Sequence, residues 1–363
     1  MIIHAFFTEQ TLGLVYLEFA LTAVVIVLAG RRLTVLGDEI AEVTGLGQVW
    51  IGATLVAFAT SLPEVVSSAT AALQPTRETI NLAFGNVLGS ETFNLVLIAI
   101  MDAMHRQGPI LAYASRKHVL TATFGIVLIG LAGLGLAGPL VAGETLVGMT
   151  GASFSAAVCI AIVGLYLVGM RLIYRQQREA DETQPIPDEL ATDIRELKSA
   201  GSLYGRFAVM ALLVTGAAVV MIGNGDAIST SPIPGLGIVP GRSLVGTLLI
   251  ALCTSLPEMT VTVAAMRIGA RDIALGNVLG SNLMNIVIIP LTSLIAWRAV
   301  FVDPNVEPVH LVTAAVGVGM TIPVVIGLKA RFKNGFLRLG WGTWLLILAY
   351  IAGIYMVWRL GRG

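Results

Sequence analysis

Charged residues are scarce in this sequence. They make up only 12% of the 363 residues, whereas 56% are hydrophobic and the mean hydropathy is +0.86. An ordinary soluble domain carries about 25% charged residues, so a soluble chain of this length would lack the polar groups to cover its surface. The sequence therefore predicts a polytopic membrane protein. The formal net charge of zero also gives no basic surface that would favour a nucleic-acid partner.

Cysteine and histidine are equally scarce. The two cysteines, Cys159 and Cys253, fall inside apolar runs, and the four histidines do not cluster. The sequence therefore predicts neither a disulfide nor a CxxC metal site. It also lacks the HExxH and GxSxG patterns of common hydrolases. We accordingly expect a protein that is not an enzyme and that needs no cofactor.

Long apolar runs take up most of the sequence instead. A transmembrane helix needs about 20 mostly apolar residues. Ten segments meet this requirement, namely 11–30, 46–73, 79–101, 119–138, 146–170, 207–225, 243–266, 273–297, 309–328 and 339–358. The longest polar connector runs from Arg171 to Arg206. It divides the chain into two halves, residues 1–176 and 204–363, which a cytoplasmic linker over residues 177–203 joins. We expect an all-α fold with five transmembrane helices in each half.

The distribution of Lys and Arg over the connectors predicts the orientation in the membrane. Seventeen of the 22 basic residues fall in the odd-numbered connectors, and five fall at the termini and in the even-numbered connectors. Because cytoplasmic connectors carry the excess of Lys and Arg, the odd-numbered connectors are predicted to be cytoplasmic and both termini to face out. We expect an integral protein of a prokaryotic-type plasma membrane, the inner membrane. The sequence implies no protein partner.

Two motifs occur twice in the sequence. Thr-Ser-Leu-Pro-Glu occupies residues 60–64 and recurs at 254–258, an offset of 194. Gly-Asn-Val-Leu-Gly-Ser occupies residues 85–90 and recurs at 276–281, an offset of 191. The chain is therefore an internal duplication. Five predicted membrane crossings separate the copies, and an odd number of crossings reverses the direction of the chain. The sequence thus predicts two inverted five-helix repeats, an architecture of many secondary transporters whose sites lie near the membrane midplane on interrupted helices.

The repeated motifs bring oxygen atoms into apolar helices. Pro63 and Pro257 each remove a helical hydrogen bond, which predicts a broken helix and a freed backbone carbonyl in both copies. Glu64 and Glu258 add carboxylates, and no Lys or Arg lies in the interior of the four motif-bearing helices to pair with them. A buried carboxylate without a partner is costly, so these two need a cation or a proton. Oxygen-only sites suit Ca2+, Mg2+ or alkali cations rather than zinc or copper.

At these motifs the chain resembles the cation/calcium exchanger superfamily, and most of all its sodium/calcium exchanger branch. That family carries two inverted repeats, each reading G-T-S-x-P-E and then G-N-x-x-G-S-N. The resemblance implies antiport of Ca2+ against Na+ or H+, with four cation positions between the second, third, seventh and eighth helices. It implies that Glu64 and Glu258 are the central ligands. The flanking ligands that it implies are Thr60, Ser61, Thr254, Ser255, Ser90, Ser281, Asn94, Asn285 and the carbonyl groups of Ala57 and Ala251.

The chain departs from the family pattern at several positions. Ala59 and Cys253 replace the glycine before each threonine, and Asn285 stands where many sodium/calcium exchangers carry aspartate. Glu91 replaces the asparagine that the second repeat keeps as Asn282. Three hypotheses for Glu91 remain open: it replaces the missing acid, it binds a proton, or it pairs at a helix interface.

The driving ion also remains open at this point. Buried carboxylates bind protons as well as metal ions, so the residues do not separate exchange of Ca2+ for Na+ from exchange of Ca2+ for H+. A channel is the competing class of protein. The inverted repeat and the predicted broken helices favour a transporter that moves about a central site.

Overall fold

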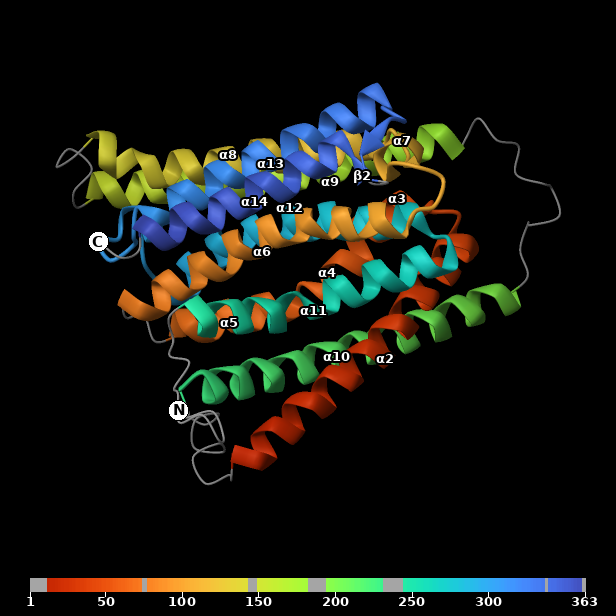
Figure 1. Ribbon diagram of the computed structural model, residues 1–363, viewed down its shortest axis with the longest axis horizontal. Coiled ribbons are helices and arrows are strands. Elements are labelled where there is room, and N and C mark those ends of the chain that lie inside the picture. Colours follow the sequence, from red (N-terminus) through yellow and green to blue (C-terminus); the bar gives the residue numbers. More distant parts are fainter. Residues whose placement is uncertain are drawn as a thin grey trace.

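The chain folds almost entirely into helices. The computed structural model describes residues 12–73, 77–142, 149–181, 194–230, 244–336 and 339–360 (Figure 1). The helices are α2 (Leu12–Thr44), α3 (Gln48–Ile51), the π-helix η1 (Gly52–Val56), α4 (Ala57–Thr60), α5 (Leu62–Leu73), α6 (Arg77–Met104), α7 (Ile110–Tyr113), α8 (His118–Ala142), α9 (Met149–Asp181), α10 (Ile194–Thr230), α11 (Leu244–Ile268), α12 (Arg271–Ala296), the 3-10 helix η4 (Val300–Val302), α13 (Val309–Ala330) and α14 (Trp341–Leu360). The strands β1 (Gly335–Phe336) and β2 (Leu339–Gly340) form a small antiparallel hairpin, in which Gly335 lies opposite Gly340.

Most of the long helices are long and apolar enough to cross a membrane. Eight described helices meet this requirement, and the bent pair Gln48–Thr60 and Leu62–Leu73 makes a ninth candidate. The predicted segment 243–266 falls on α11. These helices confirm the prediction of an all-α polytopic membrane protein, with the two-residue strands of the hairpin as the one departure among the described residues.

Several helices run further than the apolar segments predicted. The segment predicted at 11–30 belongs to α2, which continues through Asp38 to Thr44 and ends at Gly45, whose φ of +66° is the left-handed geometry that glycine favours at a helix end. At 33 residues, α2 is longer than the roughly 20 residues that span a bilayer. Likewise α9 reaches Asp181 and α10 begins at Ile194, so helices occupy much of the predicted linker 177–203. Residues 182–193 of that linker lie outside the described part of the chain.

The helices form layers around α6 and α12. In Figure 1, α2 and α10 lie side by side at the bottom, α8, α9, α13 and α14 lie at the top, and α5, α6, α11 and α12 lie between them. Burial follows this order, because 61% of the most apolar part of α6 and 67% of that of α12 are buried, against 22% for α2 and 17% for α14. The motif-bearing helices are therefore the core of the molecule, and the outer helices expose apolar side chains.

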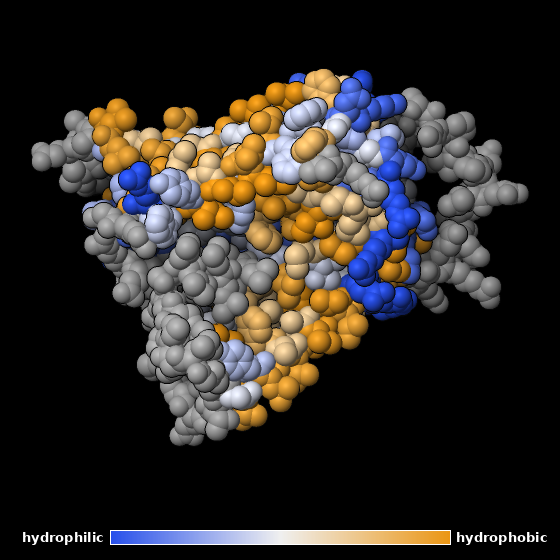
Figure 2. Space-filling model, in the orientation of Figure 1, coloured by the Kyte–Doolittle hydropathy of each residue, from blue (hydrophilic) through white to orange (hydrophobic). Residues whose placement is uncertain are grey.

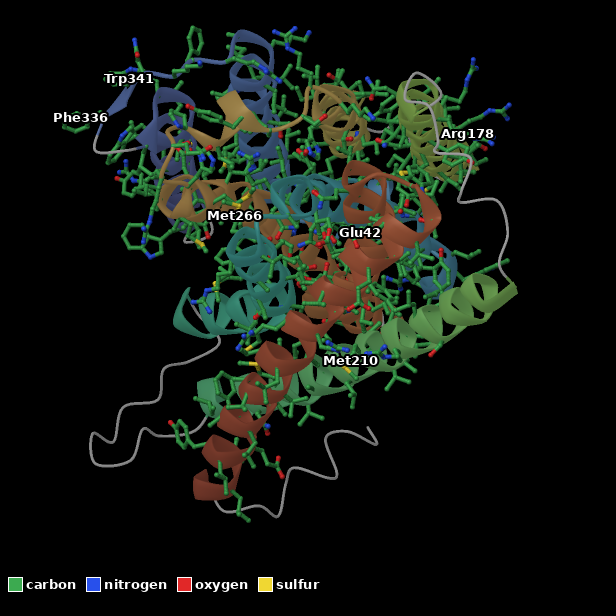
Figure 3. All side chains as sticks on the ribbon, turned by 90° about the vertical axis from the view of Figure 1, so that its right-hand side faces the viewer. Glu42, Arg178, Met210, Met266, Phe336 and Trp341 are labelled. Carbon is green, nitrogen blue, oxygen red and sulfur yellow. The ribbon has the colours of Figure 1, made fainter. Side chains whose placement is uncertain are left out.

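One end of the molecule is hydrophilic. Figure 2 shows hydrophilic residues gathered at the right-hand end and hydrophobic residues over the middle of this face. The same end holds α7 and the β1–β2 hairpin, whereas α2 begins and α14 ends at the opposite end (Figure 1). Figure 3, viewed from the hydrophilic end, labels Glu42 on α2, Arg178 on α9 and Trp341 at the start of α14. This end collects connectors that the sequence predicts to be cytoplasmic.

Candidate cation site

The first copy of the repeated motif breaks its helix, and the second does not. Ser61, with φ −85° and ψ 0°, separates α4 from α5, and the two parts of the span are bent by 43°. Pro63 follows as the second residue of α5, where a missing N–H costs little. In contrast, α11 runs through Pro257 without interruption. The prediction of a broken helix is therefore wrong for the second copy, because a proline removes only one hydrogen bond and a packed membrane helix can continue past it.

The two motif glutamates face the interior. Glu64 on α5 and Glu258 on α11 are each only 1% exposed. The Ser90 hydroxyl lies 3.5 Å from Glu64 Oε1, and the Ser61 hydroxyl donates to Glu258 Oε1 at 3.4 Å. The Oε2 atom of each glutamate has no hydrogen-bond partner within the described structure. Each carboxylate thus keeps one oxygen for a ligand.

Thr60 links the first motif to the second repeat. Its hydroxyl donates to Asn277 Oδ1 at 3.0 Å and lies 3.3 Å from the Ser281 hydroxyl, both on α12. It also lies 3.2 Å from the carbonyl oxygen of Ala57 in its own helix. These contacts join residues more than 200 positions apart in the sequence. They place oxygen atoms of both repeats beside the two glutamates.

Further buried oxygens of the predicted set lack hydrogen-bond partners within the described structure. Asn94 donates through Nδ2 to Asn282 Oδ1 at 3.0 Å, which leaves Asn94 Oδ1 unpartnered. The Ser255 hydroxyl and both amide atoms of Asn285 are also unpartnered, and all three residues are almost completely buried. Buried polar atoms are nearly always satisfied in folded proteins, so such a group of oxygens fits a ligand that supplies positive charge.

The remaining predicted ligands are Thr254 and the carbonyl groups of Ala57 and Ala251. Thr254 is fully buried on α11. The carbonyl oxygen of Ala57 already accepts a hydrogen bond from the Ser61 N–H at 3.0 Å, and the Thr60 hydroxyl lies 3.2 Å from it. Ala251 lies on the part of α11 whose side-chain surroundings are outside the described structure. The prediction that these carbonyls are ligands therefore gains no direct support from their geometry.

Glu91 is buried beside α12. It is 1% exposed, neither of its carboxylate oxygens has a partner among the described residues, and its backbone carbonyl accepts a hydrogen bond from Asn282 Nδ2 at 3.1 Å. No group of three or more His, Cys, Asp or Glu side chains that could hold a metal ion occurs in the described ranges. A cation at Glu64 and Glu258 would therefore rely on hydroxyl and amide oxygens as its other ligands.

Two hydroxyl groups near the site escaped the sequence analysis. Ser68 accepts a hydrogen bond from Asn86 Nδ2 at 3.3 Å, and Thr262 accepts one from Asn277 Nδ2 at 3.4 Å. A signal for them exists in the sequence, because each follows its motif glutamate by four residues, one helical turn. No repeated motif marks the buried Asp102, which accepts hydrogen bonds from the Gly340 N–H at 2.6 Å and the Thr343 hydroxyl at 2.7 Å. Asp102 ties the hairpin to α6 and has a structural role.

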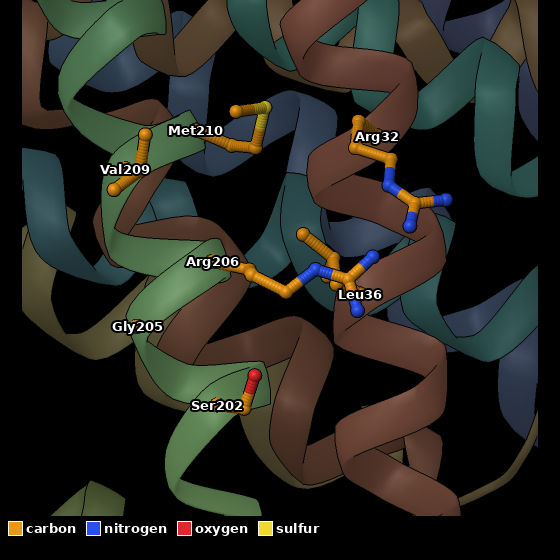
Figure 4. A pocket seen from close by; sticks show the side chains of 7 residues that line it. All are labelled: Arg32, Leu36, Ser202, Gly205, Arg206, Val209 and Met210. Atoms are coloured by element: carbon orange, nitrogen blue, oxygen red, sulfur yellow. The ribbon is translucent and has the colours of Figure 1, made fainter. Parts of the chain in front are cut away.

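A groove on the outside of the molecule lies apart from these residues. It has a volume of about 370 Å3 and runs between α2 and α10. Arg206 extends from α10 toward α2, whereas the side chain of Arg32 lies over α2 and points away from α10 (Figure 4). None of the predicted ligands lines it.

Comparison with known proteins agrees with this architecture. The sodium/calcium exchanger protein family matches residues 14–175 and 202–359. The inner membrane protein YrbG of Escherichia coli is 28% identical over 266 residues, which cover 73% of this chain and 74% of that protein. The sodium/calcium exchanger MaX1 of Methanosarcina acetivorans is 29% identical over 332 residues, which cover 86% of this chain and 92% of that protein.

The fold also matches a solved structure. The sodium-calcium exchanger NCX_Mj, soaked with 10 mM Na+ and zero Ca2+, superposes with a TM-score of 0.69 at 20% identity, covering 95% of this chain and 99% of that one. The family match extends over both halves of the chain and includes both copies of the repeated motifs. The chain therefore belongs to the sodium/calcium exchanger protein family of membrane cation antiporters.

Proposed function

We propose that this antiporter exchanges Ca2+ for Na+ at a site centred on Glu64 and Glu258. The observation that carries the proposal is the pair of buried glutamates, which come from the two copies of one motif and have no Lys or Arg in the interior of their helices. Two carboxylates balance the charge of one Ca2+, and the surrounding hydroxyl and amide oxygens are of the type that Ca2+ and Na+ accept. MaX1, a relative of similar length, is named a sodium/calcium exchanger, which supports the same choice of ions.

We propose further that the two halves are inverted five-helix repeats and that all ten predicted segments cross the membrane. Alternating access then exposes the site, near the membrane midplane, first to one side and then to the other. Both termini face out in this arrangement, because the basic residues concentrate in the odd-numbered connectors. Ser90, Ser281, Asn94 and Asn285 complete the cation positions together with the hydroxyl groups of the two motifs.

Exchange of Ca2+ for H+ is the second candidate. Glu91 favours it, because a buried carboxyl group with no described hydrogen-bond partner is most stable when it is neutral. Asn285, in place of the aspartate of many sodium/calcium exchangers, removes one acid from the central site. A smaller negative charge there would hold fewer Na+ ions.

Reconstitution tests the proposal. The purified protein is reconstituted into lipid vesicles, and Ca2+ is supplied on both sides of the membrane. Movement of Ca2+ across the membrane is then followed under an imposed Na+ gradient, an imposed H+ gradient, or neither. Ca2+ accumulation against its own gradient, driven by Na+, is the expected result. Accumulation driven by H+ alone supports the second candidate. Movement only down the Ca2+ gradient would identify a channel, and no Ca2+ movement under any gradient would refute both exchange proposals.

A further inference from the structure

Two hydrogen-bonded pairs flank the glutamates in equivalent positions of the two repeats. Ser68 and Thr262 differ in position by 194, the offset of the two glutamates, and Asn86 and Asn277 differ by 191, the offset of the second motif. In both repeats the asparagine Nδ2 donates to the hydroxyl, at 3.3 Å to Ser68 and 3.4 Å to Thr262. We refer to Asn86–Ser68 and Asn277–Thr262 as the hydroxyl–amide pairs. The same bond at equivalent positions indicates that the arrangement was duplicated together with the motifs.

The pairs lie on opposite sides of the glutamates. Figure 1 shows that α5 ends at the end of the molecule where α11 begins, so the two helices run in opposite directions. Each hydroxyl residue follows its glutamate by four positions, which is about 6 Å along a helix. Thr262 is therefore displaced from Glu258 toward the hydrophilic end of the bundle, and Ser68 is displaced from Glu64 toward the opposite end.

The asparagines of the two pairs differ in exposure. Gly85 is exposed and Asn86 is half-buried, whereas their equivalents Gly276 and Asn277 are buried. Among the described residues Asn86 bonds only to Ser68, so its amide oxygen is unengaged. The amide oxygen of Asn277 accepts the hydrogen bond from Thr60. The amide of Asn86 is thus partly open to its surroundings and that of Asn277 is enclosed, while the hydroxyl residues Ser68 and Thr262 are both 1% exposed.

Close packing accounts for the enclosure. A Cβ atom placed on Gly276 would lie 3.0 Å from the backbone of Gly52 and Ala53 in η1, and one on Gly280 would collide with the carbonyl oxygen of Ala53. The equivalent of Gly280 in the first repeat is Gly89, and no described atom lies within 4 Å of a Cβ placed there. The face of α12 is therefore sealed by η1, and the corresponding face of α6 is open at Gly89.

We propose that each hydroxyl–amide pair is a secondary binding position for the transported cation, one on either side of the glutamates. The inference rests on the proposed exchange function and adds to it a route for the ion. A serine or threonine hydroxyl and an amide oxygen are hard ligands that suit Ca2+ and Na+. They carry no formal charge, so they hold a cation more weakly than the glutamates do and release it readily. In the present structure the amide of Asn86 is accessible, whereas Ser68 and the Asn277–Thr262 pair are buried.

The test compares the two faces of the membrane. Right-side-out and inside-out membrane vesicles are prepared from cells that produce the wild type, Ser68→Ala or Thr262→Val, and the KM for Ca2+ is measured at each outward-facing surface. Thr70→Val and Thr260→Val are the controls, since they remove a hydroxyl from the same helices outside the pairs. Ser68→Thr and Thr262→Ser, which keep a hydroxyl, are expected to restore the wild-type KM and show that the protein folds.

The expected result is reciprocal. Ser68→Ala raises KM at the extracellular face by about threefold to tenfold, the effect of losing one polar contact, and leaves KM at the cytoplasmic face unchanged. Thr262→Val does the opposite. Equal shifts at both faces, or wild-type KM values for both variants, would overturn the proposal. Failure of the wild type to move Ca2+ would refute the proposed function instead, and the same comparison with radioactive Na+ would then test the pairs.

Discussion

Individual residues determine which charges the membrane interior must accommodate. Glu64 and Glu258 are buried to 1% exposure, and each keeps one carboxylate oxygen without a hydrogen-bond partner among the described residues. Two such charges close together repel each other and are poorly solvated, so a divalent cation between them relieves both costs. This balance makes the glutamates the residues whose replacement has the clearest expected effect.

Neutral variants of the glutamates test this balance. We expect Glu64→Gln and Glu258→Gln each to abolish Ca2+ uptake into vesicles, because each removes one of the two charges that oppose Ca2+ while keeping the size of the side chain. The exposed Glu42 at the end of α2 provides the control Glu42→Gln, for which normal uptake is expected. Near-normal uptake by either site variant, at normal protein levels, would contradict the assigned site.

Glu91 and Asn285 are tested as a pair. If Glu91 compensates for the acid that Asn285 lacks, Glu91→Gln should weaken binding of the coupling ion more than binding of Ca2+, since Glu64 and Glu258 remain. Asn285→Asp should favour additional Na+ or H+. A double-mutant cycle on Na+-driven and H+-driven Ca2+ flux should then give a coupling of about 0.5–3 kcal/mol, as residues of one site do. Additive effects, or a silent Glu91→Gln, would make Glu91 a residue of the helix interface.

At the scale of helices, η1 and α12 approach each other closely at their backbones. Gly52 approaches the backbone of α12 so closely that a Cβ on it would lie 2.8 Å from the Ile273 carbonyl oxygen. Small residues allow such approach of membrane helices. The π-helical geometry of η1 and the break at Ser61 occur in the same span, so the first repeat has an irregular helix where the second has a continuous one. The irregular span is the element that covers the α12 face of the site.

Equivalent glycines of the two repeats offer a matched test of this contact. Gly280→Ala is expected to destabilise the protein by about 1–3 kcal/mol, because the added methyl group overpacks the contact with Ala53. Gly89→Ala, at the equivalent position of α6, is expected to change stability little, since no described atom lies within 4 Å of the added Cβ. Thermal unfolding in detergent measures both. Equal unfolding temperatures for the two variants would show that the α12 contact is not close-packed.

The molecule is hydrophilic at the end that lies to the right in Figure 2 and broadly apolar over the middle of the face shown there. The start of α2 and the end of α14 lie at the same end of the molecule, opposite the hydrophilic end (Figure 1). The proposed ten crossings, an even number, require the start of α2 and the end of α14 to lie on the same side of the membrane. The basic residues predict the orientation of the protein in the membrane, because cytoplasmic connectors carry the excess of Lys and Arg.

Tags and proteases test this topology. Tags on both termini should be accessible from outside intact cells, and the connector from Arg171 to Arg206 should be cleaved only after the cells are opened. The expectation follows from the excess of 17 basic residues over five in the predicted cytoplasmic parts. Cleavage of that connector from outside would reverse the predicted orientation. A control site engineered into the predicted extracellular connector near Arg298 should be cleaved in intact cells.

The sequence by itself determined the membrane class, the family and the candidate ligands. Hydropathy is a property of each segment alone, so the apolar runs predicted nearly every long helix, and the duplicated motifs identified Glu64 and Glu258 without any knowledge of their contacts. Helix ends were predicted less well. The first helix continues from its apolar run into polar residues and ends only at Thr44, just before Gly45.

Only the tertiary structure decided which oxygens meet and which remain free. The bonds from Thr60 to Asn277 and from Asn94 to Asn282 join residues about 200 positions apart, and local patterns carry no information about such contacts. The same applies to the two prolines, because whether a helix breaks or continues past a proline depends on the neighbours that satisfy its freed carbonyl. Identical motifs therefore gave a broken span around Ser61 and a continuous α11, since the two copies pack against different surroundings.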